Sequence, residues 1–289
     1  DFQSVHRHYV VYSLTFRNSY SFVQCAHYLE NKIYNFNFQT PRQHLKNDNQ
    51  WDLLIFTQHW PETVCQIWTH HKPSHACTMP NKRDTWTIHG VWPTKLGTLG
   101  PAFCNKTWLF DPEQVKPIED DLEQSWTNIE KGTPLYDFWA HEWNKHGTCA
   151  ALLDAFNSEL KYFSKGISWL KTYSMTDILK ASNIVPSSDK LYQVDDIYSA
   201  VKKSIGKNPV IECKYEDGKQ YIFEIRICFN KVLDLEDCDG VVHRSEHMGN
   251  ILSNCKASVG ILYPHDDTPP KKMYVQLYKF TNWLQWYTL

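Results

Sequence analysis

The sequence predicts an α+β fold in which a central, largely antiparallel β-sheet is flanked by several helices and stapled by disulfides. Three observations favour this class. Segments with a period of two and segments with a helical period are mixed along the chain, without regular strand–helix alternation. A hydrophobic content of 42% over 289 residues is enough for a sizeable core. Nine cysteines at irregular spacing, with no repeated C-x-x-C pair, are typical of disulfides rather than of a zinc ribbon.

We expect one domain with added ends. Residues 1–48 lack clear periodicity and end in a polar run, so we interpret them as an N-terminal extension of unknown role. Residues 49–265 form the predicted domain, and residues 266–289 lose the strand and helix periods and are interpreted as a C-terminal tail. The stretch from Tyr9 to Leu14 is too short and too interrupted for the apolar core of a signal peptide, which is therefore either absent or already removed.

Strands are expected at three places. Residues 51–57 are a short apolar run ended by Pro61, which is typical of a buried strand. Residues 86–89 resemble a second strand. Between residues 221 and 229, apolar side chains alternate with a second, mixed set, which predicts a half-buried strand.

A helical pattern covers about residues 112–163. Four apolar residues recur within it at helical spacing and are expected to face the core: Leu152, Phe156, Leu160 and Phe163. A second helix is expected after the start signal Thr176-Asp177 and before Pro186, and a short third one over residues 194–201. No apolar run approaches the roughly 20 residues that a transmembrane helix needs, so membrane insertion is not expected.

The charge of the chain excludes a strong global attraction to nucleic acid at neutral pH. The formal net charge is -2 and the pI is about 6.7, so a polyanion would need a local cationic site. Fourteen histidines change this balance, because their partial protonation below about pH 6.5 would make the protein net cationic. The cysteines indicate the oxidising secretory route, and the glycosylation sequon that begins at Asn105 adds weak support.

Two short segments place titratable groups among aromatic residues. They are residues 86–93, Trp-Thr-Ile-His-Gly-Val-Trp-Pro, and residues 138–149, Phe-Trp-Ala-His-Glu-Trp-Asn-Lys-His-Gly-Thr-Cys. If the second segment is helical, four of its residues occupy two neighbouring faces, as the pairs Glu142 with His146 and His141 with Lys145. One helix edge would then present two imidazoles, an ammonium group and a carboxylate.

This set suits the cleavage of RNA by transphosphorylation. RNA supplies its own nucleophile, the 2′-hydroxyl, so the protein needs a base, an acid and positive charge for the phosphorane. His89 and His146 can share the proton transfers, and Lys145 can meet the developing charge. Each acid or base contribution is worth on the order of 10² to 10⁴ in rate, so the loss of either histidine should nearly abolish turnover.

Other interpretations of these segments stay open. His-Glu-Trp-Asn-Lys-His is H-E-x-x-x-H, whereas a zinc protease helix requires H-E-x-x-H, and the extra residue turns the second ring about 100° away. We therefore expect no metal and no cofactor. The segment can also be an ordinary amphipathic helix with Trp139 and Trp143 packed inward, and His89 a satisfied histidine of an apolar strand. A non-catalytic extracellular binding protein on the same scaffold is the alternative function.

Taken together, the two segments resemble the active-site signatures of the ribonuclease T2 family: a histidine in an I-H-G-L-W-P-like strand, and F-x-x-H-E-W-x-K-H-G-T-C. The resemblance extends from about Trp51 to Pro264. It implies four disulfides that spacing alone cannot select, namely Cys65–Cys77, Cys104–Cys149, Cys213–Cys255 and Cys228–Cys238. Cys25 is left over. Thr94 stands where many relatives carry an Asp that helps to read the first base.

The resemblance also implies a role for each matching residue. His146 would be the base toward the 2′-hydroxyl, His89 the acid toward the leaving 5′-oxygen, and Glu142 and Lys145 the stabilisers of the phosphorane. His141 would hold the phosphate. Bases would contact three further residues, by stacking on Trp92 and by lying near Gln58 and Phe138.

The expected enzyme is an acid-active, metal-independent endoribonuclease for single-stranded RNA. Its product would be a 2′,3′-cyclic phosphate that is later hydrolysed to a 3′-phosphate. The resemblance and the composition together predict a monomer that does not act on DNA. They also predict that the protein is secreted or resides in the lysosomal or endosomal lumen.

Overall fold

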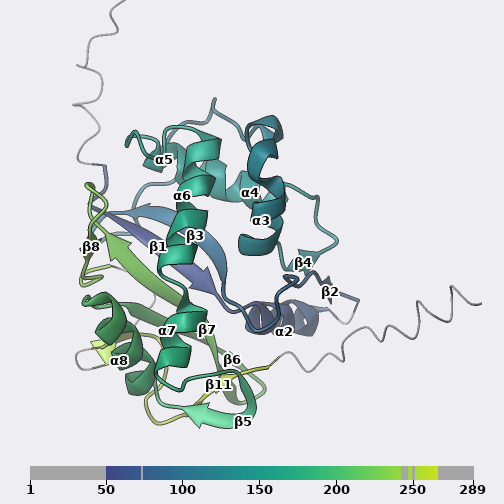
Figure 1. Cartoon of the computed structure of the whole chain (residues 1–289), viewed down its shortest axis with the longest axis vertical. Helices are drawn as coiled ribbons and strands as arrows, with labels where there is room; N and C mark the ends of the chain where they lie inside the picture. Colours follow the sequence, from purple (N-terminus) through teal and green to yellow (C-terminus); the bar gives the residue numbers. More distant parts are fainter. Residues whose placement is uncertain (1–49, 73, 242–246, 249–250, 266–289) are drawn as a thin grey trace, which may run out of the picture. The chain divides into compact units, whose positions relative to one another are not determined.

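A single mixed sheet forms the centre of the computed structural model, which describes residues 50–72, 74–241, 247–248 and 251–265. Within this part, nine strands join the sheet, and its main path runs β3-β1-β7-β6-β10-β9. Figure 1 shows β1, β3 and β7 near its centre. β11 pairs with β5 and β7, and β8 pairs with β7. The strands of the sheet are β1 (Leu53–His59), β3 (Thr87–Thr94), β5 (Ser187–Tyr192), β6 (Val210–Glu216), β7 (Lys219–Phe229), β8 (Leu235–Glu236), β9 (His247–Met248), β10 (Ile251–Ser253) and β11 (Ile261–Tyr263).

Pairing in this sheet is antiparallel except where β10 meets β6 and β11 meets β7. The predicted α+β class with a largely antiparallel sheet is therefore confirmed. The strand expected at residues 51–57 is β1, and the one expected at residues 86–89 is the first half of the longer β3. A separate small ribbon pairs β2 (Ala76–Cys77) with β4 (Glu130–Lys131).

β7 lies between β1 and β6 and is buried on both faces, so the prediction of a half-buried strand was wrong. On one face, Ile225 and Ile227 belong to the main core that the helices cover. Cys228 belongs to a second apolar cluster on the other face. Because side chains alternate along a strand, Glu224 and Arg226 share that second face with Cys228, and both are buried there.

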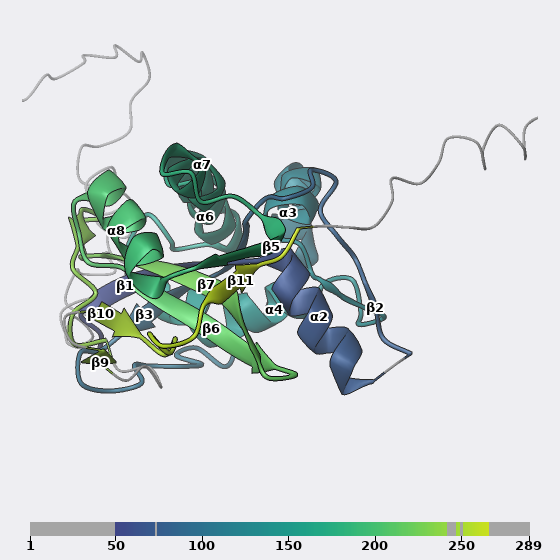
Figure 2. The ribbon, with the colours of Figure 1, turned by 90° about the horizontal axis from the view of Figure 1, so that it is seen from below.

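Helices α6, α7 and α8 cover one face of the sheet (Figure 2). The helices are α2 (Pro61–His71), α3 (Glu119–Ser125), α4 (Asp137–Glu142), α5 (Thr148–Ala150), α6 (Glu159–Thr172), α7 (Met175–Ala181) and α8 (Val194–Ile205). Two 3-10 turns, η2 (Pro112–Gln114) and η3 (Lys116–Ile118), precede α3, and a π-helical turn, η4 (Trp143–Gly147), follows α4.

The helix boundaries differ from the predicted ones where turn chemistry decides. Pro61 begins α2 as well as ending β1, because the fixed φ of proline suits the first turn of a helix. The predicted stripe is interrupted by turns over residues 151–157, since the hydroxyl of Ser158 caps α6 and sets its start. α7 likewise begins after Ser174, two residues before the predicted signal. The third predicted helix is α8, which extends to Ile205.

The four expected disulfides form in the structure and tie loops to the elements around the sheet. They are Cys65–Cys77, Cys104–Cys149, Cys213–Cys255 and Cys228–Cys238. The predicted extension and tail, and Cys25, lie outside the described residues. No helix in the described ranges combines the length and the apolar character that crossing a bilayer requires.

Candidate active site

His89 occupies a β-bulge in β3. Gly90 pairs with Thr57 and Ile88 pairs with Gln58, so His89 is the extra residue between two consecutive pairs of β1 and β3. Bulges re-aim side chains and are common next to active sites. The indole of Trp126 satisfies the His89 carbonyl through a 2.8 Å hydrogen bond. The imidazole is 29% exposed and lines a pocket whose walls include His59, Asn128, Phe138 and His141.

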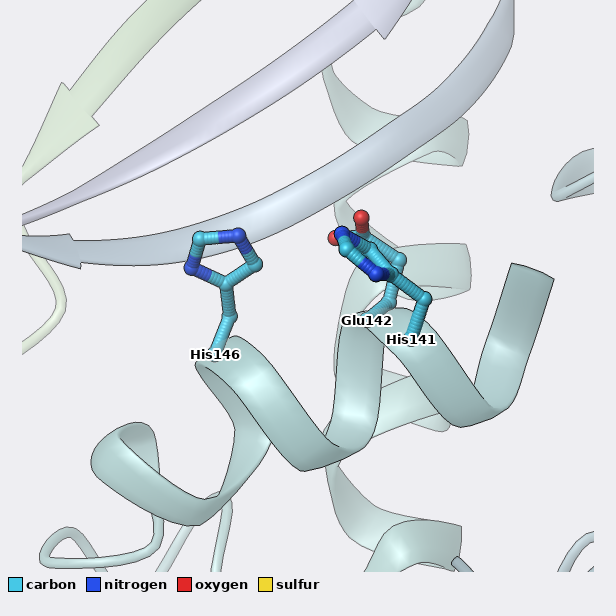
Figure 3. A group of neighbouring side chains, drawn as sticks. All are labelled: His141, Glu142 and His146. Carbon is cyan, nitrogen blue, oxygen red and sulfur yellow. The ribbon is translucent and has the colours of Figure 1, made fainter. Parts of the chain in front are cut away.

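The second signature is not the single α-helix that we predicted, because α4 widens into the π-helical turn η4 after Glu142. π turns are frequent at functional sites. Gly147 permits this one, since a Cβ there would lie 2.3 Å from the ring of Trp143. The turn brings His141 onto the same side as Glu142 and His146, and one polar atom from each lies within 4.8 Å of the other two (Figure 3).

Trp92 joins the two segments. Its ring lies 4.9 Å from that of His89 and 5.5 Å from that of His146, and its Nε1 donates a 2.8 Å hydrogen bond to Oε2 of Glu142. This contact requires glycine at position 90, because a Cβ there would lie 2.1 Å from both of the hydrogen-bonded atoms. Trp92 thus holds the strand that carries His89 against the helical turn that carries His146.

Trp92, which is expected to stack on a base, lies among protein groups in the structure. The residue is only 8% exposed, and the guanidinium of Arg226 lies 5.4 Å from its ring in addition to the two histidine contacts. Its indole N–H is also engaged. The contacts of this ring in the structure are therefore with protein groups, and its stacking on a base stays a prediction.

Gln58, which is expected near the second base, is not among the residues that line the pocket of His89. Its side chain is fully buried, its Nε2 donates to the carbonyl of Tyr173 at 2.7 Å, and its Oε1 accepts from the amide of Met175 at 3.2 Å. The amide thus ties β1 to the segment between α6 and α7. The next residue, His59, lines the pocket instead, with its ring parallel to that of Phe138 at a centroid distance of 6.3 Å.

Burial controls the charge of Glu142. Its carboxyl is 1% exposed, and this burial raises its pKa to about 7, although His89, Trp92 and Lys145 act in the opposite direction. The ammonium of Lys145 is therefore close enough to act on Glu142, as it does on His141. In mild acid the carboxyl of Glu142 is protonated and can donate a hydrogen bond.

The surroundings shift the pKa values of the neighbouring imidazoles in different directions. Burial, followed by the charge of His89, lowers the pKa of His59 to about 3, so this ring is neutral in mild acid. Burial, Lys145 and His89 also lower the pKa of His141. Burial alone would lower the pKa of His89 too, but the Glu224 carboxylate outweighs it and raises this pKa above the ordinary value of 6.5.

Three donors at the spacing of His141, Glu142 and His146 also suit a divalent cation. The surroundings favour an anion instead. Lys145 adds positive charge beside the same atoms, and the carboxyl of Glu142 is largely neutral below pH 7. A positive, proton-donating group of this kind matches a phosphate oxygen better than a metal ion.

The model of the Ribonuclease T2 family matches residues 51–238, well over half of the sequence. The chain belongs to the ribonuclease T2 family. Ribonuclease Oy of Magallana gigas is 38% identical over 193 residues, which cover 65% of this chain and 88% of the relative. Ribonuclease T2 of Sus scrofa is 37% identical over 195 residues, which cover 66% of this chain and 90% of the relative. The predicted membership, and with it a T2-type enzyme, is confirmed.

Solved structures of this family share the fold. The crystal structure of human RNase T2 is 34% identical and superposes with a TM-score of 0.61, over 74% of this chain and 99% of the human one. The structure of RNase NT in complex with 5′-AMP is 26% identical, also with a TM-score of 0.61, over 74% of this chain and 98% of that one.

In this member of the ribonuclease T2 family, the structure gathers all five residues expected to carry the chemistry: His89, His141, Glu142, Lys145 and His146. The sequence interpretation missed Glu224, whose carboxylate lies 2.6 Å from Nδ1 of His89. A signal was present, because Glu224 and Arg226 interrupt one of the most apolar stretches of the chain.

Proposed function

We propose that this chain is an endoribonuclease that cleaves single-stranded RNA by transphosphorylation, without a metal ion. The observation that supports the proposal is the shared surroundings of the two catalytic imidazoles. Both rings contact Trp92, and His141 lines the pocket of His89 while lying beside His146. A phosphate held at His141 would therefore be within reach of a base on one side and an acid on the other.

In the first step, His146 takes the proton of the 2′-hydroxyl and the oxygen attacks the phosphorus. The bond from phosphorus to the 5′-oxygen breaks, and His89 gives its Nε2 proton to that oxygen. The result is a 2′,3′-cyclic phosphate and a free 5′-hydroxyl. Water can then open the cyclic phosphate to a 3′-phosphate, with the two histidines exchanging roles.

Lys145 and Glu142 stabilise the phosphorane in this proposal. The ammonium supplies positive charge, and the protonated carboxyl of Glu142 donates a hydrogen bond to a phosphate oxygen. Because burial raises the pKa of this carboxyl to about 7, the donor is present in mild acid and is lost at alkaline pH. Activity should accordingly be highest in acid.

The second base is proposed to lie against Phe138. The ring of Phe138 is partly exposed and lines the same pocket as His59 and His89. An aromatic face accepts any base by stacking, so this contact provides affinity rather than strict selectivity.

The remaining parts of the proposal concern the protein as a whole. Residues 49–265 form the catalytic domain, and the molecule acts as a monomer on RNA and not on DNA. Four disulfides support an oxidising location, secreted or in the lysosomal or endosomal lumen. Asn105 is proposed to be glycosylated, since it is exposed and its Oδ1 accepts a 2.8 Å hydrogen bond from the sequon hydroxyl of Thr107.

The test is the digestion of RNA homopolymers with EDTA present, followed by identification of the new termini. Wild-type protein should release 2′,3′-cyclic phosphate ends, whereas His89→Ala and His146→Ala should each lose at least about 10²-fold in rate. His70→Ala is the matched control, because His70 is exposed and pairs with Glu216 away from the pocket. Full activity in His146→Ala, or complete loss in EDTA, would refute the mechanism. RNA binding without cleavage would favour the non-catalytic alternative.

A further inference from the structure

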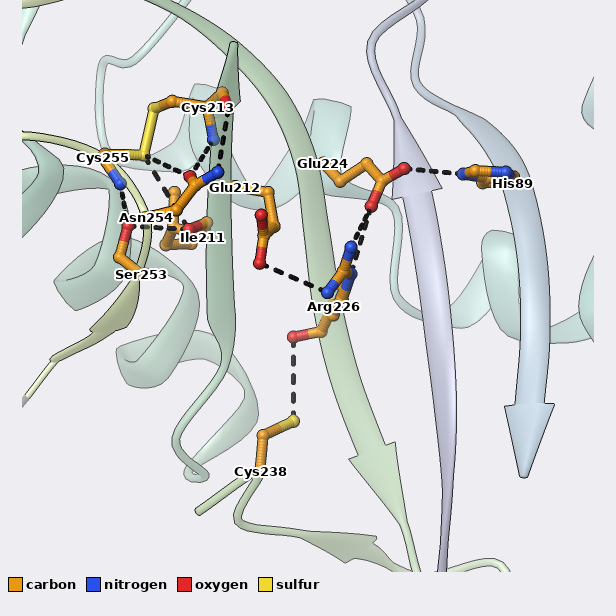
Figure 4. Close-up of polar contacts among 10 residues, drawn as sticks. All are labelled: His89, Ile211, Glu212, Cys213, Glu224, Arg226, Cys238, Ser253, Asn254 and Cys255. Atoms are coloured by element: carbon orange, nitrogen blue, oxygen red, sulfur yellow. Dashed lines mark hydrogen bonds and ion pairs between the residues drawn. A yellow bond between two sulfur atoms is a disulfide. The ribbon is translucent and has the colours of Figure 1, made fainter. Parts of the chain in front are cut away.

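A row of buried charged side chains lies behind His89 on the face of the sheet opposite α6, α7 and α8. Nδ1 of His89 lies 2.6 Å from Oε1 of Glu224, and Arg226 donates to the other oxygen of that carboxylate from Nε at 3.1 Å and from a terminal nitrogen at 2.6 Å. The second terminal nitrogen of Arg226 donates to Glu212 at 3.2 Å. Figure 4 shows this row crossing from β3 over β1 to β7 and β6.

The sheet register explains why these residues meet. Glu224 of β7 stands opposite His59 of β1 on one side and opposite Glu212 of β6 on the other. Two carboxylates directly across a pair of strands repel each other. Arg226, two residues along β7, lies diagonal to Glu212 and bridges both acids, which removes the repulsion and holds Glu224 in place.

His89 stands at one end of this row. The carboxylate of Glu224 lies 2.6 Å from Nδ1 of His89 and attracts a positive charge on the ring, so the row favours the imidazolium. Although burial opposes ionisation, Arg226 and His89 keep the pKa of Glu224 well below its ordinary value, so the partner of His89 is a carboxylate.

We propose that Glu224 is the positioning residue of the acid: its carboxylate accepts the Nδ1–H of His89, so that Nε2 faces the scissile phosphate, and Arg226 with Glu212 fixes that carboxylate. The inference rests on the proposed function. When the bond from phosphorus to the 5′-oxygen breaks, the Nε2 proton moves to that oxygen. The Nδ1 proton stays on the ring, hydrogen-bonded to Glu224, which does not itself take a proton.

Several other titratable or charged groups face His89 or its pocket and belong to the same balance. They are His59 on β1, Arg226 on β7, Asp137, His141 and Glu142 on α4, and Glu130 on β4. Among the described residues, Glu224 is the one whose side chain hydrogen-bonds the imidazole of His89. Replacing it therefore changes the contact with His89 and the ion pair with Arg226, and leaves the other groups in place.

The experiment compares wild-type protein with Glu224→Gln by NMR titration of ¹⁵N-histidine. The amide keeps the shape and an acceptor oxygen but removes the charge. We expect the neutral ring of His89 in the wild type to carry its proton on Nδ1, and the variant to titrate at a lower pH. In cleavage of poly(U), the alkaline limb of kcat/KM, to which the deprotonation of Glu142 also contributes, should move to lower pH, with kcat at pH 7 reduced about tenfold or more.

The control is Glu159→Gln, which removes a buried carboxylate whose polar partners are Trp108 and Asp111. It should leave both the His89 titration and the pH profile unchanged. A folded Glu224→Gln protein with the wild-type titration and tautomer of His89 would overturn the inference. If the wild type cleaves no RNA, the proposed function fails, but the NMR titration still decides the role of Glu224.

Discussion

The buried carboxyl of Glu142 makes a quantitative prediction about stability. Its pKa is raised from 4.5 to about 7 by burial, so the folded protein holds this proton more tightly than the unfolded chain does. The resulting stability is fully present below pH 4.5 and is lost as the pH rises through about 7. A pKa shift of this size corresponds to about 3 kcal/mol of unfolding free energy. Glu142→Gln, a neutral side chain of the same shape, should not show this loss.

The assay is urea unfolding at several pH values from 4.5 to 8, with the disulfides intact and with tryptophan fluorescence as the signal. His59 and His89 titrate in both proteins, so their contributions largely cancel when the two pH profiles are subtracted. The difference should favour the variant by about 3 kcal/mol more at pH 8 than at pH 4.5. Parallel profiles would refute the conclusion that the fold keeps Glu142 neutral. Reduced cleavage by the same variant at pH 5 would connect this proton to the chemistry.

Three further predictions follow from single contacts. His59→Gln should gain stability relative to wild type in acid, by about 2 kcal/mol between pH 6.5 and 4.5 in urea unfolding, because the folded pKa of His59 is about 3 and the wild type loses stability as pH falls. Gly90→Ala should lower kcat/KM at least about tenfold, since its Cβ would displace Glu142 from Trp92; a folded variant with normal activity would contradict this. Asn105→Gln should abolish a glycosidase-sensitive gel shift of protein secreted from eukaryotic cells, and an unchanged shift would exclude Asn105.

The five proposed catalytic residues could be named from the sequence because they lie in two short segments. Residue types and spacing within those segments suggested them without knowledge of the fold. Their geometry was not predictable in the same way. The argument from helical spacing assumed 3.6 residues per turn, whereas the π-helical turn after Glu142 adds a residue and brings His141 beside His146.

Contacts between distant strands account for the other errors. Alternation along β7 could not reveal that β1 and β6 flank it and that both of its faces are covered, so Glu224 and Arg226 counted as ordinary polar positions. Gln58 and His59 are adjacent residues of one strand and point to opposite faces. Only the pairing register shows which of the two side chains lines the pocket, and this register depends on residues about thirty positions away in β3.

The surplus residue in β3 makes the acid sensitive to chain length as well as to composition. Removing one amino acid just before Ile88 would let β1 and β3 pair without a bulge. The imidazole would then follow the regular alternation of side chains along the strand. Such a protein would keep every pocket residue and could still fold, yet its acid would face another direction. No point substitution inside the pocket would repair it, whereas reinserting any small residue at the deletion would.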